Sequence, residues 1–150
     1  MSSPSKPFEC RWRPSAILLV LYLTALGLAL LSVALIDIAP GWRFLAWAAC
    51  FAHALWVLPR YVLLSHRQAF LGLRRTEAGW ALWRQGEGWL AVQLRPDSLA
   101  LPWVVVLRFR IPGERFSRGL CIACDALPAE QHRRLRVQLK FSRRRWAAAE

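Results

Sequence analysis

Few residues in this chain have types and spacing that could perform chemistry, and two cysteines come first. Cys121 and Cys124 form a CxxC pair, the spacing of half a zinc site or of a thiol redox centre. A structural zinc ion needs four ligands, and although His132 could supply a third, no fourth is evident. A cysteine that finishes a strand can instead pack as a small apolar residue. We expect this structural role, with metal or redox chemistry as the alternative.

The acidic and hydroxyl residues form no recognisable catalytic arrangement. Most of the nine Asp and Glu residues fall in turns or near helix starts, where local backbone hydrogen bonds explain them. No two of them are obviously held together for general acid–base catalysis. No serine lies in a GxSxG elbow, and the sequence has neither a P-loop nor a GxGxxG motif. We therefore expect a protein that is not an enzyme and that uses no cofactor and no metal.

Basic residues carry the strongest chemical signal in the chain. Lys and Arg number 21 against 9 Asp and Glu, which gives a formal net charge of +12. Such a charge suits anionic lipid headgroups, acidic proteins or nucleic acid. The densest cluster lies toward the C-terminus, and we predict that it contacts a protein partner or lipid. Its members are Arg133, Arg134, Arg136, Lys140, Arg143, Arg144 and Arg145.

The run Arg108-Phe109-Arg110 alternates basic and aromatic residues, as RNA-binding strands can. Base stacking usually needs several exposed aromatic rings on one face of a sheet. In a half-buried strand Phe109 is expected to point into the core. A domain beside a membrane also meets anionic lipid before it meets nucleic acid, so we expect no nucleic-acid partner.

Two apolar runs of the chain must position the cysteine, acidic and basic residues described above. Ser15 to Ile36 has no charged residue, and as a helix it spans about 30 Å, the thickness of a bilayer's hydrocarbon core. The alternative, a buried helix of a soluble protein, needs a large core that the rest of the chain does not offer. A weaker run extends from Trp42 to about Leu64, and its exit is marked by Pro59 and Arg60. The sequence thus predicts a transmembrane hairpin.

The flanks of these runs predict their orientation. Basic residues lie in the leader before the first run and again after the second, whereas the turn beside Asp37 has only Arg43. The positive-inside rule therefore places both termini in the cytoplasm. Trp12 stands where an interfacial anchor would, and Cys10 and Cys50 lie near or within the membrane segments.

His53 falls in the middle of the second run. Ionisable groups inside a membrane are energetically unfavourable, so one reading is a site for a proton or a ligand. The other is a neutral imidazole hydrogen-bonded to the neighbouring helix. We expect the second, since neither run contains an acidic partner.

After the second run the pattern changes to short apolar segments separated by turns, which predicts an antiparallel β-meander. The expected strands are 69–74, 80–83, 89–94, 104–111 and 116–122. A helix from about Pro128 to Phe141 places His132, Leu135 and Leu139 on one face, and this face can cover the sheet.

The fold class we expect is an α+β membrane protein. A two-helix transmembrane hairpin is followed by a small antiparallel β-meander, which a C-terminal helix caps. The segments are a basic cytoplasmic leader at 1–14, the hairpin at 15–64 and a cytoplasmic β-rich domain with its helix at 65–150.

Three stretches of the chain carry a resemblance to a known family. They are Arg11-Trp12-Arg13-Pro14-Ser15, Trp103 to Phe109, and the Asp-Ala-Leu step at 125–127 that leads into the basic sequence RRLRV at 133–137. Together with the whole layout they resemble the bacterial inner-membrane YgfX family, also called CptA-type toxins. The resemblance covers nearly the entire chain and includes no catalytic signature.

The resemblance implies partners that the residues alone do not. Members of the family are inner-membrane proteins encoded beside a small SdhE-type protein, which is linked to flavinylation of succinate dehydrogenase and has been described as an antitoxin. The toxin reading holds that the membrane protein binds FtsZ and MreB and disturbs cell division and cell shape. The alternative is an accessory role with the SdhE-type protein in assembly of succinate dehydrogenase.

Overall fold

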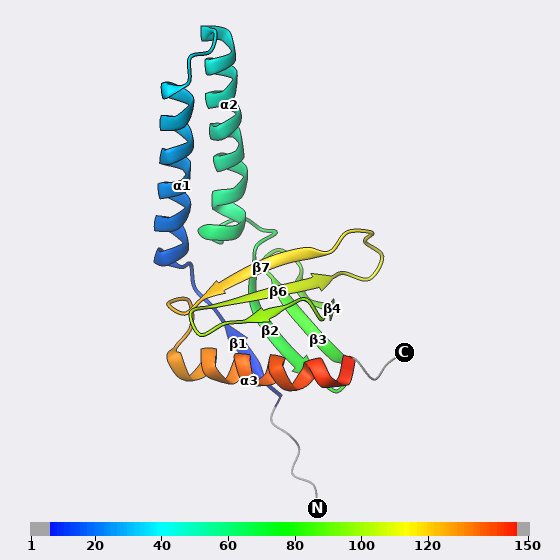
Figure 1. Cartoon of the computed structure of the whole chain (residues 1–150). Coiled ribbons are helices and arrows are strands. Elements are labelled where there is room, and N and C mark those ends of the chain that lie inside the picture. Colours follow the sequence, from blue (N-terminus) through cyan, green and yellow to red (C-terminus); the bar gives the residue numbers. More distant parts are fainter. Residues whose placement is uncertain (1–6, 147–150) are drawn as a thin grey trace, which may run out of the picture.

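A computed structural model describes the backbone of residues 7–146 and the side chains of residues 7–141. It contains a hairpin of two apolar helices and an antiparallel sheet with a helix across one face, as Figure 1 shows. The expected α+β fold class is confirmed.

The local sequence explains where each helix of the hairpin starts. Helix α1 (Ala16–Leu35) starts at Ser15, whose Oγ accepts a hydrogen bond of 3.1 Å from the backbone N–H of Leu18. This satisfies one of the free N–H groups of the first turn. Helix α2 (Pro40–Val57) has proline at its first position, where the missing N–H has no intrahelical partner to lose.

A single π-helical turn, η1 (Leu58–Val62), ends the second apolar run. Pro59 cannot donate a backbone hydrogen bond, so the regular helical ladder is interrupted there. The N–H of Leu63 instead reaches the carbonyl of Leu58 at 2.7 Å, one residue further back than in an α-helix. The run therefore ends where Pro59 and Arg60 predict.

Both helices expose their apolar side chains. Helix α1 contains no buried residue, and α2 contains one, Ala54. Leu35 and Leu55 are each 78% exposed. Ala16–Leu35 and Pro40–Val62 are long and apolar enough to cross a membrane. The helices are thus not the buried core of a soluble domain.

Polar side chains join the two helices to each other. The hydroxyl of Tyr22 lies 3.0 Å from Nδ1 of His53, and the indole N–H of Trp47 donates to the carbonyl of Leu30 at 3.3 Å. The prediction that His53 bonds to the neighbouring helix is confirmed.

Tyr22→Phe is expected to weaken the hairpin by about 0.6 kcal/mol, the average measured for hydrogen bonds between membrane helices, and by no more than about 1.7 kcal/mol. The matched control is Thr24→Val, because among the described residues Thr24 Oγ1 bonds only to the carbonyl of Val20 in its own helix, at 2.8 Å. Unfolding of the chain by SDS in mixed micelles measures the difference. Equal stabilities of the two variants would contradict a role for the bond to His53.

The sheet is antiparallel throughout and follows the chain almost in order. Its order is β1-β2-β3-β4-β6-β5. Strands β4 and β5 pair with different parts of one edge of β6, and β7 pairs with the opposite edge. The strands are β1 (Glu9–Arg11), β2 (Phe70–Thr76), β3 (Gly79–Arg84), β4 (Gly88–Leu94), β5 (Leu99–Ala100), β6 (Val104–Arg110) and β7 (Arg118–Ala123). The five expected strands are all present, and β1 and β5 were not predicted.

Strand β1 precedes the hairpin yet belongs to the sheet that follows it. Cys10 pairs with Leu73 of β2 and is buried. Trp12 is 5% exposed, and its indole N–H donates to the carbonyl of Phe70 at 2.9 Å. The prediction of an interfacial anchor at Trp12 was wrong, because the ring packs in the sheet's core. Cys10 likewise belongs to that core and not to a membrane segment.

Helix α3 (Ala129–Trp146) covers the core face of the sheet. His132, Leu135 and Leu139 are each at most 4% exposed, which confirms that they share the buried face. The helix continues beyond the expected end at Phe141, since no glycine or proline interrupts the residues that follow. In Figure 1, α3 lies on the side of the sheet away from α1 and α2.

The loop before α3 is tied to the start of α1. The carboxylate of Asp125 accepts hydrogen bonds from Ser15 Oγ and, at 3.2 Å, from the backbone N–H of Ile17. Desolvation opposes ionisation there, but these bonds outweigh it and lower the pKa of Asp125. An anionic group at a helix N-terminus also complements the helix dipole. The sheet and the hairpin are thereby held together.

Candidate functional site

The outer side of α3 brings four of the predicted basic residues together. Arg133, Arg136 and Lys140 recur at intervals of three and four residues, so they form one stripe along the helix. Arg133, Arg134 and Lys140 are exposed, and Arg136 is half-buried. Burial of Leu135 and Leu139 fixes the rotation of the helix and therefore the direction of this stripe.

A groove of about 450 Å³ lies between this stripe and the β5 region, and we call it the basic groove. It is lined by Ser98, Ala100, Pro102, Arg133, Arg136, Val137, Leu139 and Lys140. Three of these residues are basic and none is acidic. Nε of Arg136 is buried without a hydrogen-bond partner among the described residues. The groove thus presents positive charge without an internal counter-ion, together with apolar side chains.

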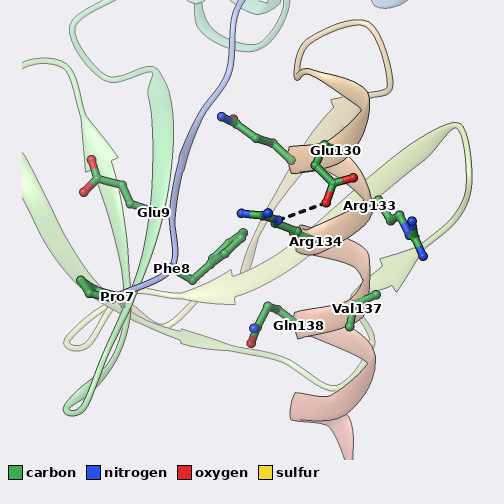
Figure 2. Close-up of a pocket in the computed structure, with 9 residues that line it drawn as sticks. Pro7, Phe8, Glu9, Glu130, Arg133, Arg134, Val137 and Gln138 are labelled. Carbon is green, nitrogen blue, oxygen red and sulfur yellow. Dashed lines mark hydrogen bonds and ion pairs between the residues drawn. The ribbon is translucent and has the colours of Figure 1, made fainter. Parts of the chain in front are cut away.

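A second groove, of about 470 Å³, lies on the other side of the stripe, between α3 and the residues around β1. We call it the leader groove. It is lined by Pro7, Phe8, Glu9, Glu130, Gln131, Arg133, Arg134, Val137 and Gln138. Figure 2 shows the ring of Phe8 directed toward Arg134 and the side chain of Arg133 on the far side of the helix.

Charges in the leader groove are largely balanced. Arg134 Nε donates to Glu130 Oε1 at 3.2 Å, a pair one helical turn apart that Figure 2 marks. Glu9 lines the same groove. The two grooves therefore differ in electrostatics, and only the basic groove has a clear preference for an acidic group.

The remaining predicted site residues continue the same helix. Arg143, Arg144 and Arg145 lie on the described backbone of α3, but their side chains fall outside the described residues.

The sequence did not predict the walls that the grooves take from other elements, such as Phe8 and Pro102. These residues meet α3 only through the register of the sheet, and no local pattern marks them.

The CxxC pair does not form a site with His132. Cys121 and Cys124 are exposed, whereas Ile122 points into the core beside α3. The expected packing of Cys121 was wrong, because the alternation of β7 turns Ile122 inward and Cys121 outward. In the described part of the chain, no group of three or more His, Cys, Asp and Glu residues could hold a metal ion.

His132 is the buried polar residue of α3. It is 3% exposed, and its Nε2 has no hydrogen-bond partner among the described residues. Desolvation and the nearby positive charge of Arg136 lower the pKa of His132, against a hydrogen bond with the backbone of Ile122. The folded protein therefore favours a neutral imidazole at this position.

Lowering the pH from 7.5 to 5 is expected to destabilise the folded domain through His132. Because its folded pKa lies below the unfolded value, the unfolded state binds more protons in this range, so stability falls as the pH falls. Thermal unfolding of the chain in nanodiscs at the two pH values measures the loss. His132→Gln should reduce the pH dependence, and His66→Gln, at a half-buried loop position, should retain it. The same pH dependence in both variants would contradict this assignment.

The basic and aromatic run of β6 is divided between two faces. Phe109 is 1% exposed and packs edge-on against Phe70, with ring centroids 5.1 Å apart, which confirms that it points into the core. Arg108 and Arg110 are exposed on the opposite face. Phe109 is therefore not a stacking surface.

Comparison with known proteins identifies a family that the chain matches over most of its length. The model of a family described as the membrane-bound toxin component of a toxin–antitoxin system matches residues 6–143. No curated protein and no solved structure matches the chain. The match spans both apolar helices, the whole sheet and most of α3.

Proposed function

We propose that this chain, which belongs to the YgfX (CptA-type) family of membrane-bound toxin components of toxin–antitoxin systems, acts by binding a protein partner through α3. The family implies an antitoxin partner of some kind. The observation that carries the proposal is the basic groove, with three basic residues, apolar walls and no acidic lining residue. An acidic segment of a partner protein would complement it.

The position of α3 supports a protein partner over lipid for this groove. Figure 1 shows α3 on the side of the sheet away from the apolar helices, and thus away from the bilayer that those helices would enter. Basic side chains attract anionic headgroups only within about a Debye length of the membrane surface. The basic residues of α3 are therefore better placed to meet a soluble protein.

The proposed location is the bacterial inner membrane, crossed twice, with both termini in the cytoplasm. Pairing of β1 with β2 supports two crossings, because the chain before α1 and the chain after α2 then share one side of the membrane. The basic residues that flank the hairpin support the cytoplasm as that side.

The proposed mechanism is binding without catalysis. The candidate partners are an SdhE-type antitoxin and the cytoskeletal proteins FtsZ and MreB, whose disturbance would alter division and cell shape. The absence of a catalytic motif in the sequence supports binding as the mode of action.

Copurification of the full chain from native membranes at moderate salt tests the proposal. Recovery of an SdhE-type protein or of FtsZ and MreB, with loss of the same protein when the basic groove is altered, is the expected result. Recovery of succinate dehydrogenase with reduced flavin content on deletion, and with normal cell shape, would favour the assembly role instead. Recovery of lipid without protein would contradict the proposal.

A further inference from the structure

Strands β6 and β7 form a two-stranded ribbon, and its outer face lies away from α3 and from the proposed binding surface. Along β6, Val105 and Leu107 are fully buried and point toward α3, so Val104, Val106 and the two arginines that follow point the other way. Cys121 pairs with Val106 and shares this outer face. Since α3 covers the core face, the outer face is directed away from α3.

One end of this ribbon lies beside the start of α1. The carbonyl of Trp103, the residue before β6, accepts a hydrogen bond of 2.8 Å from the N–H of Cys124. The next residue is Asp125, whose carboxylate bonds to Ser15 and Ile17 at the first turn of α1. Trp103 is nevertheless 63% exposed, so a large indole ring faces solvent close to where the apolar helix begins.

The other end of the ribbon carries a second exposed ring. Phe116, in the β6–β7 turn, is 82% exposed, the highest value among the large apolar residues described. Its neighbour Arg115 is exposed and has no described partner. Figure 1 shows this turn reaching the level at which α1 begins and α2 ends.

We propose that the β6–β7 ribbon is a second membrane contact, resting on an anionic bilayer surface. The proposal requires that α1 and α2 cross the membrane. Trp103 and Phe116 then lie in the headgroup region, where aromatic rings are favoured, and Arg115 meets lipid phosphate. The sheet is thereby held parallel to the bilayer, and the outer side of α3 is directed toward the solution.

Depth-dependent quenching tests this contact in the full chain. Cys50, Cys121 and Cys124 are replaced by serine, whereas Cys10 is retained because it is 2% exposed and desolvation by burial raises its pKa to about 12. Single cysteines are then introduced as Phe116→Cys, Trp103→Cys, Val137→Cys or Leu28→Cys and labelled with a polarity-sensitive fluorophore. The protein is placed in vesicles of equal parts phosphatidylglycerol and phosphatidylcholine that contain spin-labelled lipid.

The expected result is quenching at positions 116 and 103 several-fold stronger than at 137, which lies on the outer side of α3. Position 28, in the middle of α1, reports separately on membrane insertion. Strong quenching at 28 with equal, weak quenching at 116, 103 and 137 would overturn the ribbon contact and leave the hairpin intact. No quenching at 28 would overturn membrane crossing and the ribbon contact with it. Undiminished quenching at 116 in pure phosphatidylcholine would overturn the preference for anionic lipid.

Discussion

Charge reversal of the basic groove, Arg133→Glu with Arg136→Glu and Lys140→Glu, is expected to lower affinity for the protein partner at least about a hundredfold. Like charges placed across an interface oppose binding by several kcal/mol. The three side chains line one groove with no acidic lining residue, so an acidic partner segment would meet repulsion along its whole length. Binding of the copurified partner to the variant in nanodiscs measures the loss.

A charge-matched control separates the groove from net charge. The neutral set Arg133→Gln, Arg136→Gln and Lys140→Gln lowers the net charge by three and should weaken binding to an intermediate degree. Gln85→Glu with Ala91→Glu and Gln93→Glu lowers the net charge by the same three at exposed positions of the sheet region, and it should leave binding unchanged. Equal weakening by both sets would show that the partner responds to overall charge and not to the groove.

Trp12→Ala is expected to destabilise the sheet domain by about 3–5 kcal/mol, the usual loss for removing a large buried aromatic side chain. The ring is 5% exposed, and its N–H is bonded to the carbonyl of Phe70. Trp12→Phe should lose less, about 1–3 kcal/mol, because most of the ring is kept and one buried carbonyl loses its partner. Denaturant unfolding of the sheet domain in nanodiscs measures both variants.

Phe141→Ala is the control for this prediction, since Phe141 is an aromatic residue that is 64% exposed and contributes little to the core. If Trp12 were an interfacial anchor, Trp12→Ala would change the free energy of unfolding no more than the control variant does. That outcome would contradict the placement of the leader within the sheet.

The elements with a clear local pattern were predictable from the sequence, and those set by distant pairing were not. The apolar run of α1 and the alternation of β6 are both visible in short windows. Strand β1 has three residues, and it exists because β2, far along the chain, supplies its partner. Trp12 illustrates the consequence: composition favours an interfacial indole, but pairing of β1 brings the ring into the core.

The candidate site was likewise predictable from the sequence only in part. The stripe from Arg133 to Lys140 follows from helical spacing, so its residues could be named in advance. The grooves on either side could not, because their other walls come from the β5 region and from the segment around β1. Cys121 shows the limit of a motif: the CxxC spacing is local, whereas the outward direction of the side chain depends on the register of β7 with β6.

Interruption of the sheet domain by the hairpin has a consequence for assembly. In the proposed two-crossing topology, residues 9–11 must pair with β2 and Asp125 must reach the start of α1, so the domain is completed only when both ends of the hairpin lie on one side of the membrane. Insertion of α1 and α2 is therefore expected to precede final folding of the sheet.

Site-specific photo-crosslinking from Val137 tests the central claim, that the outer side of α3 binds the protein partner, most directly. Val137 is 45% exposed and lines both grooves, and Glu77, in the exposed β2–β3 turn, is the control position. In cells that carry p-benzoylphenylalanine at one of these positions, we expect the copurifying protein to be crosslinked from 137 and not from 77. Crosslinks to that protein from 77 alone, or crosslinks from 137 to lipid alone while it still copurifies, would contradict the claim.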